Sequence, residues 1–116
     1  MSTPARAAAD AYIARVNERD LDGLVELFAP EALLLAAGGQ RLEGKEAIRA
    51  FYEGTVLVSA PMVRGVHFVQ QDATCVMELE ATLPAAPDLT AHMVDVLTVG
   101  GDGRIVRLAI YMRLDA

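Results

Sequence analysis

Apolar residues in the first half of the chain recur every three or four positions, which is the spacing of amphipathic helices. The dipeptide Thr3-Pro4 is a typical helix start, and the spacing continues in a shorter helix over residues 20–30 and a third over residues 44–53. Residues 32–37 form a short apolar run that ends at two glycines, which predicts an edge strand. The inward-facing positions of the helices are Ala8, Ala9, Tyr12, Ile13 and Val16, then Leu21, Leu24, Val25 and Phe28, and finally Ala47, Ile48, Phe51 and Tyr52.

The second half alternates apolar and polar residues, most clearly over residues 75–80, and this is the period of a half-buried strand. Turn residues at 71–72 and the glycine-rich run 100–103 predict two hairpins, with a loop over residues 84–88 between them. The strands of these hairpins are 62–71 with 73–82, and 90–99 with 104–114. Helices followed by antiparallel strands predict an α+β fold in which the helices cover one face of a curved sheet.

Length and composition indicate one soluble globular domain over residues 1–116. Apolar residues make up 53% of the chain and charged residues 22%, which excludes a disordered protein. No apolar run reaches the roughly 18 residues of a membrane span, and the N-terminal segment lacks the apolar centre of a signal peptide. The single cysteine, Cys75, cannot form an internal disulfide and is expected in the core, so we expect a cytoplasmic protein without a membrane partner.

The charge balance argues against a nucleic-acid partner. Ten Lys and Arg residues stand against 16 Asp and Glu residues, a net charge of -6, and aromatic residues make up only 5% of the chain. His67 and His92 have no Cys or carboxylate at the spacing of a metal site, so no metal is expected. The chain also lacks the glycine-rich motifs that bind nucleotides and the motif of a serine nucleophile, so no cofactor is expected.

Asp95 is the residue that the apolar pattern singles out. It lies within residues 92–99, where both faces of the predicted strand are otherwise mostly apolar. Carboxylates are rarely buried without a partner, because the charge would lose several kcal/mol of hydration. Either Asp95 lies at the solvent-exposed rim of the sheet, or burial raises its pKa and keeps it protonated as a hydrogen-bond donor.

The tyrosines are the second group of candidates. Tyr12 lies on the apolar side of the first predicted helix, where its hydroxyl needs a hydrogen-bond partner. Tyr52, on the third predicted helix, can supply that partner, although tyrosines in such positions are more often core residues than catalysts. Tyr111 lies on the last strand and either lines the same cavity or faces a dimer interface.

Three segments of the chain have recognisable patterns. Residues 12–17 read Tyr-Ile-Ala-Arg-Val-Asn, residues 20–29 read Asp-Leu-Asp-Gly-Leu-Val-Glu-Leu-Phe-Ala, and residues 44–52 read Gly-Lys-Glu-Ala-Ile-Arg-Ala-Phe-Tyr. Together they resemble the bacterial Δ5-3-ketosteroid isomerases, and the match continues through Asp95 and residues 101–106. The wider nuclear-transport-factor-2-like superfamily, which includes the SnoaL-like proteins, shares the helical half more loosely.

The resemblance implies a cone-shaped fold with an apolar cavity between three helices and a mostly antiparallel sheet. In those isomerases the matching Tyr and Asp donate hydrogen bonds to a steroid oxygen as a dienolate forms, so Tyr12 and Asp95 would form an oxyanion hole, supported by Tyr52. A small hydrophobic ligand and a second copy, paired through the outer face of the sheet near His92, are the implied partners. Apolar residues expected around the ligand are Phe28, Phe51, Val63, Met77, Leu97 and Met112.

The general base of those isomerases has no counterpart here. It is an Asp on the first strand followed by Pro, and counting from Tyr12 without a gap places Ala36 and then Ala37 at these positions. Moving a proton between two carbons needs a positioned base, which a methyl group cannot provide. Three interpretations follow: a steroid isomerase without its base, a homologue that acts on another ketone or polyketide, or a non-catalytic binder of a small hydrophobic ligand.

Overall fold

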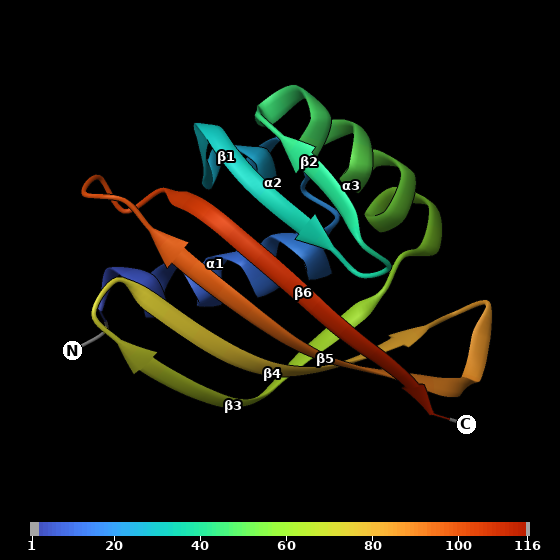
Figure 1. The fold of residues 1–116 in the computed structure, drawn as a ribbon. Helices are drawn as coiled ribbons and strands as arrows, with labels where there is room; N and C mark the ends of the chain where they lie inside the picture. Colours follow the sequence, from blue (N-terminus) through green and yellow to red (C-terminus); the bar gives the residue numbers. More distant parts are fainter. Residues whose placement is uncertain (1–2, 116) are drawn as a thin grey trace.

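The computed structural model describes residues 3–115, and within them three helices pack against a curved sheet of six strands (Figure 1). The predicted α+β architecture is therefore confirmed. The elements in chain order are α1 (Pro4–Glu18), α2 (Leu21–Glu26), β1 (Phe28–Ala36), β2 (Gln40–Glu43), α3 (Lys45–Ser59), β3 (Met62–Gln71), β4 (Thr74–Leu83), β5 (Ala86–Val99) and β6 (Ile105–Asp115). The strand order is β2-β1-β6-β5-β4-β3, with β1 parallel to β6 and every other pair antiparallel.

The helix starts follow from local capping chemistry. The Thr3 hydroxyl accepts a hydrogen bond from the backbone N–H of Arg6 at 3.1 Å, and Pro4 occupies the first turn of α1. The Asp20 carboxylate likewise accepts from the N–H of Gly23 at 2.9 Å and begins α2. Both helix starts could be predicted from the sequence because these caps involve only neighbouring residues.

Three boundaries differ from the sequence prediction. Phe28 begins β1 instead of ending the second helix, and α3 continues six residues beyond Glu53 to Ser59. The predicted loop over residues 84–88 shrinks to a two-residue turn, because Ala86 already pairs with Leu83 and residues 87–89 bulge out of the ladder.

The short apolar run of β1 predicted an edge strand, but β1 does not lie at the edge of the sheet. It lies between β6 and β2, and β2 forms that edge. The sequence of β2 is Gln-Arg-Leu-Glu, which is too short and too polar to show a strand pattern, although charged residues are typical of edge strands. Gly38 and Gly39 make the hairpin between β1 and β2 with positive φ angles of 88° and 87°.

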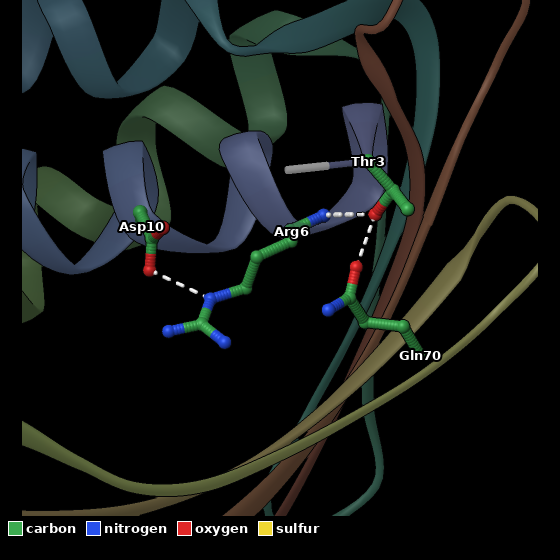
Figure 2. A network of polar contacts seen from close by, with 4 residues as sticks. All are labelled: Thr3, Arg6, Asp10 and Gln70. Carbon is green, nitrogen blue, oxygen red and sulfur yellow. Dashed lines mark hydrogen bonds and ion pairs between the residues drawn. The ribbon is translucent and has the colours of Figure 1, made fainter. Parts of the chain in front are cut away.

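A polar network fixes the start of α1 against β3 (Figure 2). The Thr3 hydroxyl donates to the side-chain carbonyl of Gln70, and Arg6 Nε donates to Asp10 at 3.0 Å. The Arg6 guanidinium also lies 3.6 Å from the centre of the Phe68 ring. The N-terminal end of α1 is thereby held on the sheet, where the main core lies.

The core fills the space between the helices and the concave face of the sheet. Cys75 is fully buried there, as its position on the apolar side of its strand predicted. The largest fully buried side chains are Phe28, Leu24, Leu34, Ile48, Met77, Leu79, Leu97, Ile105 and Leu108. Among residues 3–115, no helix combines the length and apolar character needed to cross a membrane.

Candidate functional site

A cavity of about 380 Å³ opens between α1, α3 and the concave face of the sheet. Its volume is in the range of sites for small organic ligands. The first helix contributes Tyr12 and Val16, and one face of α3 contributes Phe51, Tyr52, Thr55, Val56 and Ser59. The strands contribute mainly apolar side chains, among them Val63, Leu79, Ala81, Ala91, Met93 and Met112. The site is therefore an apolar chamber with a few polar groups.

Asp95 is the buried acid of this chamber. Its side chain is 1% exposed, which excludes the rim position that the sequence left open. The carboxyl oxygen Oδ1 has no hydrogen-bond partner among the described residues, although the residue lines the cavity. Loss of hydration raises the pKa of Asp95 from its ordinary value of 3.8 to about 7. Below neutral pH the residue is therefore an uncharged acid that can donate a hydrogen bond into the cavity.

Tyr12 and Tyr52 form a hydrogen-bonded pair beside Asp95. Their hydroxyl oxygens lie 2.7 Å apart, and the rings meet edge to face with centres 6.1 Å apart. Burial is the main cause that raises the pKa of Tyr12, and the nearby charge of Asp95 raises it further. When the Tyr52 hydroxyl donates to Tyr12, the proton of Tyr12 is free to donate to a ligand. The two tyrosines thus provide a second uncharged donor next to the first.

Phe51, Val63 and Met112 line the cavity, at positions where the sequence placed ligand contacts. Phe28, Met77 and Leu97 do not line it, which corrects the expectation for these three side chains. Phe28 packs behind Tyr52, with ring centres 6.2 Å apart. The other two lie in the core that α1 covers closely, because its residues there are buried alanines: Ala5, Ala8 and Ala9.

The position at which the resemblance to the isomerases places a general base lies at the end of β1. Ala36 is 6% exposed and does not line the cavity, whereas the next residue, Ala37, does. Among the described residues, the titratable groups of the lining are Tyr12, Tyr52 and Asp95. The acids Glu31, Glu43 and Asp22 are exposed and lie outside it. Apart from Asp95, no carboxyl group of the described residues lines the cavity.

The far part of the cavity lies beyond the end of the predicted third helix. Thr55, Ser59 and Pro61 belong to it, but the predicted helix stopped at Glu53 and left them unassigned. The signal was present, since Phe51, Thr55 and Ser59 are spaced four residues apart and share one face of α3.

The segment after α3 is anchored by the end of α1. The Asn17 side chain donates to the backbone carbonyl of Val63 at 2.8 Å and accepts from its N–H at 2.7 Å. The Arg19 guanidinium donates to the carbonyl of Ala60. These contacts join residues more than forty positions apart in the sequence, so no local sequence pattern predicts them. They fix the rim of the cavity on its α3 side.

The outer face of the sheet carries the remaining candidates. Tyr111 is 60% exposed and pairs in register with Val94, which is 40% exposed, so Tyr111 faces away from the cavity. His92 pairs in register with Glu80 and Arg113 and also lies outside the cavity. Within residues 3–115, no three His, Cys, Asp or Glu side chains gather closely enough to hold a metal ion.

Residues 9–108 match the family described as SnoaL-like domain. RV0760c from Mycobacterium tuberculosis shares the fold with a TM-score of 0.87 and 18% identity, over 99% of this chain and 98% of that one. A second structure of RV0760c contains estradiol-17beta-hemisuccinate. The Δ5-3-ketosteroid isomerase from Mycobacterium sp. has a TM-score of 0.80 and 21% identity, over 98% of this chain and 100% of the isomerase.

The epoxide hydrolase/cyclase-like enzyme SalBIII, which acts in pyran ring formation in salinomycin, has a TM-score of 0.81 and 23% identity. The similarity covers 92% of this chain and 88% of SalBIII. No curated protein sequence matches this chain significantly. The fold is therefore shared by proteins that perform different reactions.

Proposed function

The chain belongs to the SnoaL-like domain family, and we propose that it binds a flat hydrophobic ketone or phenol whose oxygen accepts hydrogen bonds from Tyr12 and Asp95. The observation that carries this proposal is the unpartnered Oδ1 of Asp95 in an apolar cavity. A buried acid without a hydrogen-bond partner lowers the stability of the protein. A ligand oxygen that accepts a hydrogen bond from Asp95 would offset this cost and so favour binding. Two similar proteins point to steroids, since one was solved with an estradiol derivative and the other is a ketosteroid isomerase.

The reaction we propose is the allylic isomerisation of a Δ5-3-ketosteroid. As the proton leaves carbon, negative charge develops on the ketone oxygen and forms a dienolate. Tyr12 and Asp95 stabilise this charge because they are fixed donors in an apolar cavity. Removal of one such donor costs about 100- to 1,000-fold in rate in other enzymes. Because Ala36 stands at the position of the base, a water molecule must take the proton from one carbon and return a proton to the far carbon of the dienolate, so turnover is expected to be slow.

The decisive experiment restores the base. Isomerisation of a Δ5-3-ketosteroid is followed by the absorbance of the conjugated product, using the parent protein, Ala36→Asp and Ala37→Asp. The second variant is included because Ala37 lines the cavity. Ala50→Asp adds the same charge on the exposed side of α3 and is the matched control. We expect the isomerisation rate of either Ala36→Asp or Ala37→Asp to exceed that of the parent by several orders of magnitude, while the control stays at the parent rate. Inactivity of every variant, together with no binding of a steroid-like phenol, would refute the steroid proposal.

A second candidate is a binding protein without turnover, which the lack of a carboxylate base in the lining favours. The substitution Asp95→Asn separates the two functions. An enzyme loses rate beyond any loss of affinity, whereas a binder loses affinity alone. Single-turnover rates and calorimetric affinities on the same preparations provide both values.

We also propose that two copies associate through the outer face of the sheet. Val94 and Tyr111 are neighbours on that face and are exposed, and Val69 of β3 is exposed on the same face. Exposed apolar groups that share a surface are typical of interaction sites. The cavity opens on the concave side, so this pairing would leave it accessible.

A further inference from the structure

One face of α3 follows the cavity from its polar end to its mouth. Phe51, Thr55 and Ser59 lie four residues apart and all line the cavity. Tyr52 marks the polar end, where its hydroxyl meets Tyr12, and Ser59 is the last residue of the helix and is exposed. A helix rises 1.5 Å per residue, so the seven steps from Tyr52 to Ser59 span about 10 Å along the helix axis. The two polar ends of the chamber are therefore separated by the length of a fused-ring compound.

The two hydroxyl groups along this face differ in availability. Thr55 donates its hydroxyl proton to the carbonyl of Phe51 at 3.0 Å, a bond within the helix. The Ser59 hydroxyl makes no hydrogen bond to any residue that the structure describes, and it lines the cavity. Ser59 is therefore the hydroxyl of α3 that is available to a ligand.

The surroundings of Ser59 select the chemistry of its ligand. Ser59 ends α3, where the last carbonyl groups of a helix carry partial negative charge. This potential favours a hydrogen-bond donor and disfavours an anion. The Arg19 guanidinium, bound to the carbonyls of Asn17 and Ala60, offsets part of this potential next to Ser59. The Ser59 hydroxyl is uncharged and can both donate and accept a hydrogen bond, so it matches a neutral hydroxyl group of a ligand.

The position of Ser59 is fixed before a ligand arrives. The next residue, Ala60, ends the helix with its N–H bonded to the carbonyl of Val56 at 3.1 Å. Its own carbonyl is held by Arg19, and Asn17 binds both backbone groups of Val63. A polar group held in place loses little entropy when it binds a ligand.

We propose that Ser59 forms a second polar subsite, which accepts a hydrogen bond from a neutral hydroxyl at the far end of a rigid fused-ring ligand. The near end of the same ligand carries the oxygen that Tyr12 and Asp95 hold. The ligand class is therefore a flat hydrophobic compound with an oxygen at each end of its long axis. This inference rests on the proposed function and adds a specificity-determining residue to it.

The test is a cycle of two ligands and several variants, measured by titration calorimetry at pH 6. The ligands are estradiol, which is a phenol with a hydroxyl at the opposite end, and its analogue without the 17-hydroxyl. We expect the parent to prefer estradiol by about threefold to tenfold, the effect of one hydrogen bond. Ser59→Ala should bind both ligands equally, and Ser59→Thr should retain the preference. Thr82→Ala removes an exposed hydroxyl that does not line the cavity, and should behave as the parent.

The outcomes separate this inference from the proposed function. Equal binding of both ligands to the parent, or a preference that survives in Ser59→Ala, would overturn the Ser59 subsite. In that case Asp95→Leu still tests the proposed function, because this substitution should weaken the binding of both ligands to the same extent. If neither ligand binds the parent, the subsite and the proposed function are both refuted.

Discussion

Asp95 makes the stability of this protein depend on pH in a direction that is unusual for a carboxylate. Burial raises its pKa to about 7 in the folded chain, whereas the unfolded chain releases the proton near pH 3.8. Between these values the folded state holds one proton more than the unfolded state. The contribution of Asp95 to the free energy of unfolding therefore falls as the pH rises through this window, and is constant outside it.

The size of the effect follows from the width of the window. One proton of difference is worth about 1.4 kcal/mol for each pH unit, so the buried carboxylate costs about 4 kcal/mol above pH 7. The substitution Asp95→Asn keeps the shape of the side chain but cannot become charged. We expect the variant to equal the parent in stability, apart from a constant offset, at pH 4 and to exceed it progressively up to pH 7. Such a gain is a large part of the total stability of a small domain.

Urea denaturation of both proteins at several values between pH 4 and pH 8.5 measures this difference. The other carboxylates titrate in both proteins, so their contributions cancel when the two curves are subtracted. Burial also raises the pKa of Tyr12 and Tyr52, which keeps both tyrosines uncharged throughout the window. A difference that does not change with pH, or that shrinks as the pH rises, would show that Asp95 is not a buried acid in solution.

Three further predictions concern the supports of the site and its outer face. Tyr52→Phe removes the partner of the Tyr12 hydroxyl and should cost about 1 kcal/mol in urea denaturation; an unchanged stability would contradict the paired geometry. Asn17→Ala breaks both hydrogen bonds to the backbone of Val63, and should lower stability by about 1–3 kcal/mol and increase amide exchange at residue 63. Tyr111→Asp places a charge on the apolar outer face and should shift a dimer to monomer in sedimentation, whereas a monomeric parent would refute the proposed pairing.

The sequence was most informative where the signal is local or periodic. The caps at Thr3 and Asp20 and the alternation of the long strands predicted the helix starts and both hairpins. Asp95 stood out because a single acid interrupted an apolar strand. The burial of Asp95 could not be derived from that pattern, since an acid at the solvent-exposed rim of the sheet gives the same sequence.

The sequence was least informative where partners lie far apart along the chain. The strand β2 has one apolar residue, Leu42, and it pairs with β1 only because the glycine hairpin brings the two together. The role of Asn17 depends on a backbone segment 46 residues away. Both features are set by the packing of complete elements, which a window of neighbouring residues does not contain.

The cavity itself arises from how residue sizes face each other across the helices and the sheet. Along α1 the buried face changes from three alanines, which allow close contact with the sheet, to Tyr12 and Val16. On the opposite side of the cavity, Ala81 and Ala91 pair in register and both line the cavity. Their small side chains leave space between the sheet and the helices. The sequence contains these sizes, but only the register of β4 and β5 places the two alanines side by side. Asp95 pairs with Met77 and lies four residues from Ala91 along β5, so the buried acid and the alanine pair occupy different parts of the cavity.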